Sequence, residues 1–411
     1  MITMRLFSLV KRLSSLIVVV FILFYVISEY FPIVLNRVEN TEFIELDSCP
    51  FCFGHSVCKL ILMTNYADLT GISKLKWLNF INGKNVYFAR LESGTDVVLK
   101  KLSWNSEIYD LGKQLCEMID LDPCDFRNAV RLYVPKFMKY FHQQSERSRA
   151  VFGIKDVLAC PSERFLSLML NNFMDDELAH VNYDRLDALS EFVTMLHLNP
   201  EPLIIQSFPA QNGWPFPHYY GACGRIIVEE NGGKPLSDYL YASWNTRVQL
   251  SYQLMKIAEK LTNNQLNLSL YMTDVNLNNF AVSPEGHLTL IDAENIIVVD
   301  KQKNWKDQPA TWNITLTNQD LGCIDCLSYS VEDLCSYQVS DHNYYAICRG
   351  ILGRNSYYAG SEGFLHNIPE SVEQTTKLSL LLEECSNPTV NDSRIYVSHQ
   401  LLSTLHNLSI S

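Results

Sequence analysis

The segment YMTDVNLNNFAVSPEGHLTLIDAEN, residues 271–295, organises the rest of the chain. Two short apolar stretches, Phe280–Val282 and His287–Ile291, flank a turn at Ser283–Gly286. Proline at the second position of this turn and glycine at the fourth are typical of a type I turn. The segment therefore predicts a tight β-hairpin.

Three polar residues, Asp274, Asn279 and Asp292, bracket the two strands of this hairpin. Because a hairpin brings its two ends together, we expect their side chains to converge at one mouth. Carboxylate and amide oxygens in such a group suit Mg²⁺ and the phosphates that it carries. A surface hairpin with polar ends is the alternative interpretation, and the flanking segments have to decide between the two.

The bulk composition describes a globular protein with an ample core. The chain has 411 residues, of which 47% are hydrophobic and 19% are charged, enough for one large or two ordinary domains. Its formal net charge of -12 argues against a general nucleic-acid binder, which needs a basic field. We therefore expect no nucleic-acid partner.

The N-terminus has the pattern of a secretory targeting segment. Residues 1–12 contain basic residues and no acid, and residues 16–27 form an unbroken apolar run. A type II signal anchor and a cleaved signal peptide both fit, because the basic flank keeps the N-terminus cytosolic. A buried soluble helix is the alternative. We expect the body of the protein to face the secretory lumen, held at the membrane if the segment is not cleaved.

Glycosylation sequons and cysteines agree with this location. Asn-x-Ser/Thr sequons occur at Asn267, Asn313, Asn391 and Asn407. The twelve cysteines should be mostly disulfide-bonded in an oxidising lumen.

Cys49 and Cys52 form a Cys-x-x-Cys pair, and Cys323 and Cys326 repeat the spacing far downstream. The lumenal location favours structural disulfides at these positions, and a four-thiolate zinc site is an alternative. A redox pair is a third interpretation, which the absence of a surrounding thioredoxin-like βαβ pattern disfavours.

Upstream of the hairpin, two strands are predicted at 85–89 and 95–100, joined by a turn at 92–94. Lys100 ends the second strand directly after three apolar residues. Its side chain either points into a cleft or belongs to a solvated strand end.

Helices and strands connect this lysine to the hairpin. The sequence predicts helices at 103–119, 184–198 and 245–261, and it predicts strands at 203–207 and 225–229. The last helix has an apolar stripe that indicates core packing, and it delivers the chain to the hairpin segment.

This order of parts resembles a protein kinase, in which a strand lysine, a helix, a hinge, a long helix, a catalytic loop and a metal-binding aspartate follow one another. More closely, the chain is similar to the divergent protein kinase domain family, in the group named for the deleted-in-autism protein. The motifs that carry the resemblance are CPFCFG (49–54), NVYFA (85–89), VVLK (97–100), NPEPL (199–203), GWPF (213–216), GACGR (221–225), LTNN (261–264), NFAV (279–282), IDAEN (291–295) and HNYYAIC (342–348).

The resemblance implies an α+β, two-lobed protein-kinase-like fold. A small, mainly β N-lobe with a helical insert and a helical, disulfide-stapled C-lobe would follow an N-terminal signal or anchor helix. The segments would be 1–35 (signal anchor or signal peptide), 36–80 (stalk and cysteine-rich segment), 81–230 (N-lobe) and 231–411 (C-lobe with a cysteine-rich end). It also implies a Golgi-associated lumenal protein or a secreted one.

The resemblance further implies site roles, which agree with the mechanics of phosphoryl transfer. Lys100 would pair with the ATP phosphates, and Asp274 would accept the substrate hydroxyl proton or orient that hydroxyl. Asn279 and Asp292 would hold Mg²⁺, so ATP and Mg²⁺ are the expected cofactors.

A carboxylate is expected to fix Lys100. Glu107, on the helix that follows the lysine, is our candidate. Glu117 on the same helix and Glu191 on the helix before the NPEPL segment are the alternatives.

Several motifs of active kinases are altered in this chain. No Gly-x-Gly-x-x-Gly precedes the lysine, where the turn has only Gly94, so this motif does not supply the backbone amides that cradle phosphate. Met272-Thr273 stands where kinases have His-Arg, and Ala293-Glu294 stands where they have Phe-Gly. A fold survives such losses more easily than catalysis does.

Two functions are consistent with these features. An active lumenal kinase would use Mg-ATP to phosphorylate a secreted or lumenal protein or glycan, and the retained site residues favour it. A pseudokinase would act without phosphoryl transfer as a secreted ligand of a cell-surface receptor or as a scaffold, and the altered motifs favour that.

Overall fold

The computed structural model describes residues 18–23, 41–63, 67–69, 85–142, 158–180, 184–304, 306, 308–319, 327–390 and 393–410. The apolar run at 16–27 falls partly outside these ranges, and its described part, 18–23, is helical. Within the described ranges, no helix combines the length and the apolar character needed to cross a membrane. Cys323, Cys326 and Asn391 lie outside the described residues.

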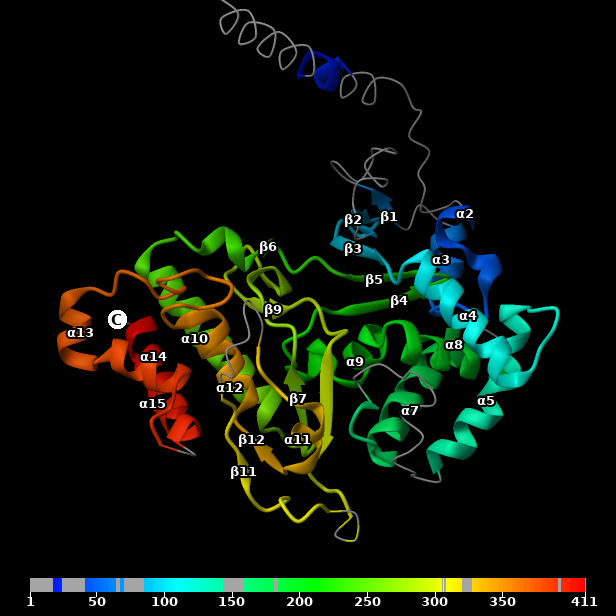
Figure 1. The fold of residues 1–411 in the computed structure, drawn as a ribbon. Helices are drawn as coiled ribbons and strands as arrows, with labels where there is room; N and C mark the ends of the chain where they lie inside the picture. Colours follow the sequence, from blue (N-terminus) through cyan, green and yellow to red (C-terminus); the bar gives the residue numbers. More distant parts are fainter. Residues whose placement is uncertain are drawn as a thin grey trace, which may run out of the picture.

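A five-stranded sheet within the described ranges carries the lysine (Figure 1). Its strands in spatial order are β1 (Ala67–Leu69), β2 (Asn85–Leu91), β3 (Asp96–Lys101), β5 (Ile226–Glu230) and β4 (Tyr219–Cys223). Neighbouring strands run antiparallel, and Lys100 in β3 lies opposite Val86 in β2 and Ile227 in β5. β2, β3 and β5 confirm the strands predicted in those parts of the chain.

Helices gather beside this sheet, at the right and centre of Figure 1. They are α4 (Asn105–Ile119), α5 (Phe126–His142), α7 (Glu163–His180), α8 (Arg185–Leu198) and α9 (Glu201–Ser207). α4 and α8 confirm the helices predicted at 103–119 and 184–198. The strand predicted at 203–207 is wrong, because α9 occupies it. Pro202 lies in the first turn of α9, a position that proline favours at the start of a helix. Nearly all side chains of α9 are buried, so its sequence lacks the apolar periodicity that distinguishes a helix from a strand.

The predicted hairpin is present. β8 (Phe280–Val282) and β9 (Leu288–Leu290) pair antiparallel, and β6 (Lys234–Pro235) pairs with the other edge of β8. The turn closes with a hydrogen bond of 2.9 Å from the amide of Gly286 to the carbonyl of Ser283. Proline and glycine in the turn therefore act as the sequence predicts.

Two longer strands and a helical part surround the hairpin. β7 (Leu268–Met272) and β10 (Ile296–Asp300) flank it and pair antiparallel. α10 (Trp244–Thr262) confirms the helix predicted at 245–261, and it packs against α12 (His342–Ile347) and α15 (Ser393–Ser409), toward the left of Figure 1. The remaining elements are α2 (Thr41–Ile44), η2 (Leu46–Ser48), α3 (Cys58–Met63), η6 (Ala210–Asn212), η7 (Leu236–Tyr239), η8 (Leu277–Asn279), β11 (Thr315–Leu316), α11 (Val331–Ser336), β12 (Val339–Ser340), η10 (Cys348–Leu352), α13 (Glu370–Thr376) and α14 (Leu378–Ser386).

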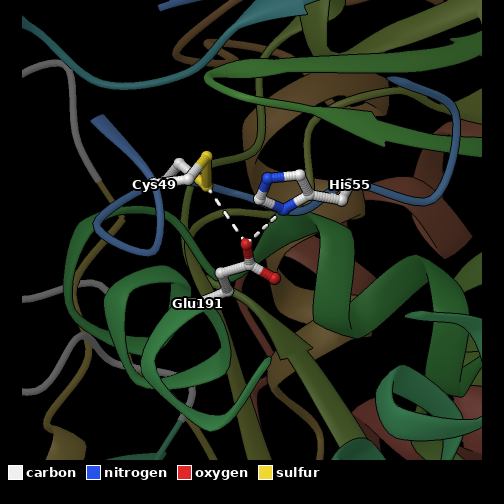
Figure 2. A group of neighbouring side chains, drawn as sticks. Cys49, His55 and Glu191 are labelled. Atoms are coloured by element: carbon white, nitrogen blue, oxygen red, sulfur yellow. Dashed lines mark hydrogen bonds and ion pairs between the residues drawn. A yellow bond between two sulfur atoms is a disulfide. The ribbon is translucent and has the colours of Figure 1, made fainter. Parts of the chain in front are cut away.

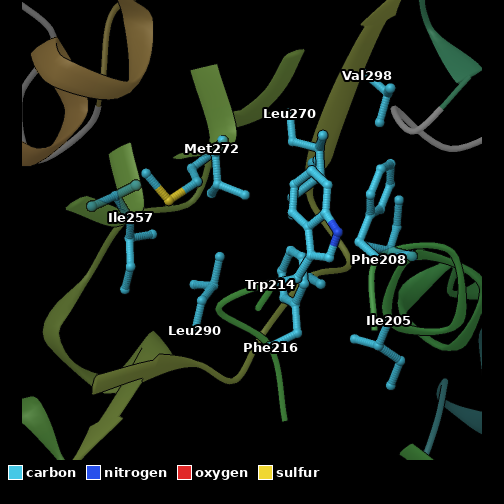
Figure 3. Packing of buried hydrophobic residues seen from close by; sticks show 14 of the residues in the cluster. Ile205, Phe208, Trp214, Phe216, Ile257, Leu270, Met272, Leu290 and Val298 are labelled. Carbon is cyan, nitrogen blue, oxygen red and sulfur yellow. The ribbon is translucent and has the colours of Figure 1, made fainter. Parts of the chain in front are cut away.

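A continuous hydrophobic core joins the hairpin to the helices beside the sheet. Figure 3 shows Phe208 and Trp214, which follow α9, next to Leu270 of β7, and Leu290 of β9 lies in the same cluster. The rings of Phe208 and Trp214 meet edge to face, with centroids 4.6 Å apart. The same core therefore fixes the ends of the hairpin relative to α9.

Disulfides connect distant parts of the chain, as the sequence predicts. The described pairs are Cys49–Cys52, Cys58–Cys223, Cys116–Cys124, Cys160–Cys335 and Cys348–Cys385. Cys58–Cys223 attaches α3 to β4, and Cys160–Cys335 attaches the segment before α7 to α11. In this structure the sulfurs of Cys49 and Cys52 are bonded to each other.

Candidate functional site

A pocket between the five-stranded sheet and the hairpin brings most of the predicted site residues together. Lys100, Glu107, Asn279 and Asp292 all line this cavity, whose volume is about 520 Å³. Small-molecule cofactors bind in cavities of this size. Asp274 lies outside the pocket lining. Apolar residues of the lining include Val86, Phe88, Val98, Leu198, Ala281 and Ile291.

Lys100 points into this pocket with a side chain that is 14% exposed. Its Nζ lies 2.8 Å from Oε1 of Glu201 and 2.8 Å from Oε2 of Glu229. It also donates to the carbonyl oxygen of Ile291 at 2.7 Å. An ammonium has three N–H donors, so these acceptors use all of them. The interpretation of Lys100 as a solvated strand end is thereby excluded.

Negative charge exceeds positive charge around Lys100. Burial lowers the pKa of Lys100, but Glu201 and Glu229 outweigh this effect and raise the pKa well above its usual range. Burial raises the pKa of Glu201 to about 8 against the opposing effect of Lys100, and the charges of Glu229 and Asp292 contribute to the increase. Burial likewise raises the pKa of Glu229. A second cation in the pocket would favour the ionised form of both glutamates.

Glu201 is a site residue that the sequence reasoning missed. It is the first residue of α9, and its amide is held by Oδ1 of Asn199 at 2.9 Å. Its Oε1 accepts the amide of Ala293 at 3.3 Å, and Nδ2 of Asn199 donates to Glu294 at 2.6 Å. The NPEPL and IDAEN motifs are therefore in direct contact. The run Asn-Pro-Glu-Pro at 199–202 could have indicated a helix that begins at Glu201, because asparagine and proline are common at the start of a helix.

The structure places Glu201 and Glu229, and not Glu107, against Lys100. The carboxylate of Glu107 turns back and accepts the amide of Trp104 at 2.8 Å, which caps the N-terminus of α4. This contact corrects the expected pairing. Of the two alternatives, Glu117 is exposed on α4, and Glu191 is buried on α8 beside His55.

The loop before the hairpin holds Asp274 in a half-buried position. Oδ1 of Asp274 accepts Nδ2 of Asn276 at 3.2 Å, and its carbonyl accepts Nδ2 of Asn279 at 3.1 Å. The side-chain nitrogen Nδ2 of Asn279 donates in this bond, so the side-chain oxygen Oδ1 is the atom that Asn279 could offer to a cation. The loop thus couples Asp274 to a residue of the pocket lining.

Asp292 follows β9 and lines the same pocket as Asn279. The amide of Ile291 donates to the carbonyl of Asn279 at 2.9 Å, which joins the two ends of the hairpin as expected. Oδ1 of Asp292 accepts the amide of Glu294 at 3.3 Å. Asp292 and Asn279 are therefore the residues that could hold a metal ion here.

A tight connection leads from β5 to β6 along the pocket. Oδ1 of Asn231 accepts the amide of Gly233 at 3.0 Å. Gly233 has a φ of +101°, and a Cβ at this position would stand 2.0 Å from the carbonyl oxygen of Val282. Only glycine fits this close approach between the connection and the hairpin.

α12 braces the strand that leads into the Asp274 loop. Asn343 accepts the amide of Met272 at 3.0 Å and donates to the carbonyl of Leu270 at 2.9 Å. Nε2 of His342 lies 2.9 Å from the carbonyl oxygen of Met272, and Nδ1 lies 2.6 Å from Nδ2 of Asn318. Burial lowers the pKa of His342 to about 4. The HNYYAIC motif thus supports the site, although sequence reasoning gave it no role.

The chain is similar to several known proteins. The protein-kinase domain of FAM69, as a family model, matches residues 192–388. Divergent protein kinase domain 2A of Xenopus tropicalis is 36% identical over 387 residues, which cover 91% of this chain and 90% of that protein. Divergent protein kinase domain 2A of Homo sapiens is also 36% identical, over 399 residues and with the same coverage. Divergent protein kinase domain 2B of Mus musculus is 26% identical over 287 residues, covering 66% of this chain and 65% of that protein.

Proposed function

Because the chain belongs to the divergent protein kinase domain family, we propose that it transfers phosphate from Mg-ATP to a lumenal or secreted acceptor, either a protein or a glycan. The observation that supports this most directly is the meeting of Lys100, Asn279 and Asp292 in one pocket. These residue types are the ones that hold ATP phosphates and magnesium in protein kinases.

The donor set of the pocket fits a magnesium nucleotide. Asp292 offers a carboxylate and Asn279 an amide oxygen, both of them hard ligands. When bound, Mg-ATP would supply the phosphoryl group, and its metal would neutralise charge on the phosphate oxygens.

The residues of the chain would share the remaining work. Lys100 would bind phosphate oxygens by exchanging at least one of its present acceptors for them. Asp274 would accept the proton of the acceptor hydroxyl or orient that hydroxyl, while Asn276 holds its carboxylate. Glu201 would keep the ammonium in place, in the role first expected of Glu107.

We also propose a secretory location and a two-lobed organisation. The exposed sequon residues Asn267, Asn313 and Asn407 would be accessible to glycosylation, and the described disulfides suit an oxidising compartment. The segments would be 1–35 for targeting, 36–80 for the stalk and cysteine-rich part, 81–230 for the N-lobe and 231–411 for the C-lobe. The protein would then be a type II membrane protein of the Golgi or a secreted one.

A pseudokinase that acts as a receptor ligand or scaffold is the second candidate, and one observation favours it. All three donors of Lys100 already have acceptors within the protein, so phosphate has to displace one of them.

Thermal unfolding of the full chain with ATP and Mg²⁺ separates the two candidates. If the protein is a kinase, ATP and Mg²⁺ together should raise its Tm. At a ligand concentration of about 100 times the Kd, binding stabilises the folded protein by about 2.7 kcal/mol. Asp292→Ala should abolish the shift, and Asp238→Ala, which removes an exposed carboxylate outside the pocket, should keep it.

Absence of a shift in the wild type would favour the pseudokinase. A shift that persists in Asp292→Ala would refute the metal assignment while leaving nucleotide binding in place. Where the shift is present, incubation with ATP labelled in its terminal phosphate and secreted proteins or glycans would identify the acceptor.

A further inference from the structure

The CPFCFG segment builds a second polar site that does not overlap the pocket of Lys100. The disulfide Cys49–Cys52 opens this segment, and none of its residues lines that pocket. The amide of Phe53 donates to the carbonyl of Gly224 at 2.7 Å, which fixes the segment on the turn after β4. Cys52 is completely buried, whereas Cys49 is partly exposed. Of the two residues, only Cys49 reaches solvent, so it is the one that an external thiol would attack in the proposal below.

A buried carboxylate contacts Cys52, the buried sulfur of the disulfide. Oε1 of Glu191, a residue of α8 with 0% exposure, lies 3.3 Å from Sγ of Cys52 and 2.5 Å from Nδ1 of His55. Figure 2 shows this carboxylate between the disulfide and the imidazole. The side chain of His55 is 15% exposed. Glu191 therefore contacts both Cys52 and His55, and the His55 imidazole is in turn partly exposed to solvent.

The charges of this group favour a proton beside Cys52. Burial lowers the pKa of His55, but its hydrogen bond to Glu191 and the nearby acids outweigh burial and raise the pKa. Burial and the charge of Glu191 raise the pKa of Glu177 to about 8. Glu177 also accepts the amides of His55 and Ser56, at 2.9 and 3.2 Å. The titratable groups that face Glu191 and His55 are Asp176 and Glu177 on α7, Asp187 on α8 and Tyr219 on β4.

This disulfide contributes little as a constraint on the chain. Cys49 and Cys52 are 3 positions apart, whereas Cys58–Cys223 spans 165 positions and Cys160–Cys335 spans 175. Restriction of the unfolded chain grows with the length of the closed loop, so the shortest loop stabilises least. A buried acid and an imidazole around such a disulfide need another explanation.

We propose that Cys49–Cys52 is a redox-active disulfide, in which Cys49 exchanges with thiols of small molecules or proteins while Glu191 and His55 move the proton of Cys52. A thiolate RS⁻ attacks Sγ of Cys49, a new RS–Sγ bond forms, and the bond to Cys52 breaks. The electron pair goes to Sγ of Cys52, which takes a proton from the Glu191–His55 pair.

A second thiolate then attacks the RS sulfur and releases Cys49 as its thiolate together with RSSR. Two RSH are thereby oxidised to one disulfide, RSSR, and the protein disulfide is reduced to two thiols. The two RSH release two protons. One returns to the Glu191–His55 pair, and the other protonates Cys49. In the oxidising direction Glu191 and His55 accept the proton of Cys52, which makes it the attacking thiolate.

Differential alkylation of the full chain tests the proposal, with the other disulfides as internal controls. The folded protein is equilibrated in glutathione buffers of graded composition, its thiols are trapped, and each cysteine is quantified by mass spectrometry. We expect Cys49 and Cys52 to become reduced together, at a ratio of reduced to oxidised glutathione at least about tenfold lower than the other described pairs require. Reduction of all pairs in the same range, or only with denaturant, would overturn the proposal.

The variant Glu191→Gln separates proton transfer from a structural role. We expect the rate of reduction of Cys49–Cys52 to fall roughly tenfold or more, and to keep only the pH dependence that the ionisation of glutathione itself gives. Glu117→Gln removes an exposed carboxylate on α4, outside this group, and it should leave the rate nearly unchanged. An unchanged rate and pH profile in Glu191→Gln would overturn the assigned role. If that variant does not fold, selective reduction in the wild type still decides the main claim.

A metal site is the competing outcome, because the ligand atoms of Cys49, Cys52, His55 and Glu191 all lie within 4.8 Å of one another. Zinc is added to the reduced protein, excess metal is removed, and the bound metal is measured. Stoichiometric zinc that prevents reoxidation by oxidised glutathione would assign the group to metal binding and would overturn thiol exchange. Loss of the zinc with normal reoxidation supports the proposal.

Discussion

At the scale of single residues, Lys100 decides what the pocket can bind. Its ammonium lies between two buried carboxylates, each at 2.8 Å. Burying charges is costly unless close partners offset the loss of water, and here one cation serves two acids. The raised pKa of Glu201 and of Glu229 is the result. A phosphate that enters the pocket has to compete with these carboxylates for Lys100.

The substitution Glu229→Gln tests this competition. A neutral amide binds the ammonium more weakly than a carboxylate does, so phosphate should displace it more easily. We expect Mg-ATP to bind about tenfold more tightly, or ~1.4 kcal/mol, as measured by calorimetric titration.

Glu230→Gln is the matched control, because Glu230 is the next residue, lines the same pocket and is exposed. It should bind Mg-ATP as the wild type does. Weaker binding in Glu229→Gln would show that this carboxylate helps to hold the nucleotide or its metal, which contradicts the competition.

At the scale of elements, α12 controls the strand from which the Asp274 loop begins. His342 and Asn343 together take the amide and the carbonyl of Met272, the last residue of β7. Both side chains are completely buried. Breaking these bonds would leave buried polar groups without partners, which is costly. The position of the loop therefore depends on a helix that lies 70 positions further along the chain.

The neutral state of His342 gives this brace a dependence on pH. Its pKa is lowered to about 4 in the folded protein, so its contribution to stability is complete above the unfolded value of 6.5. The contribution is lost as the pH falls from 6.5 through 4, by on the order of 3 kcal/mol. We expect His342→Gln to remove this part of the acid destabilisation seen in urea unfolding between pH 7 and 4.5.

Carboxylates elsewhere also titrate in this range, so the measured quantity is the difference in slope between variant and wild type. His287→Gln, which replaces an exposed histidine directly after the hairpin turn, should retain the wild-type slope. An equally steep loss of stability in His342→Gln would contradict the assignment.

At the scale of the whole molecule, two disulfides join parts that are remote in sequence. Cys58–Cys223 closes a loop of 165 positions and Cys160–Cys335 closes one of 175, so the two loops overlap. Cys116–Cys124, by contrast, spans 8 positions beside α4. The long cross-links restrict the unfolded chain as a whole, and the short one restricts a single connection.

Paired replacement of cysteines by serine should show this difference in the free energy of unfolding. From loop-closure entropy, loss of Cys160–Cys335 should cost about 5 kcal/mol, and loss of Cys116–Cys124 should cost about 2.6 kcal/mol. Chemical unfolding of both double variants at constant pH gives the comparison. Equal losses would mean that strain or residual structure in the unfolded chain outweighs loop length.

Local sequence patterns determined much of the fold. The hairpin, the strand that ends in Lys100 and the helix at 245–261 follow from turn chemistry and apolar periodicity, which act within a few residues. The motifs of the family were readable for the same reason, and they pointed to Asn279 and Asp292 as neighbours. The segment at 203–207 was misread because its side chains are buried on nearly every face, so α9 carries no periodic signal.

Only the tertiary structure decided which carboxylates meet Lys100 and which cysteines pair. The lysine is 101 positions from Glu201 and 191 positions from the carbonyl of Ile291. Glu107 is much closer in sequence, yet it caps its own helix. Which acid reaches an ammonium depends on how α9 packs against the sheet through a shared hydrophobic core, and no local pattern contains that packing. The sequence by itself determined the hairpin and the residue types of the site, and the core determined their partners.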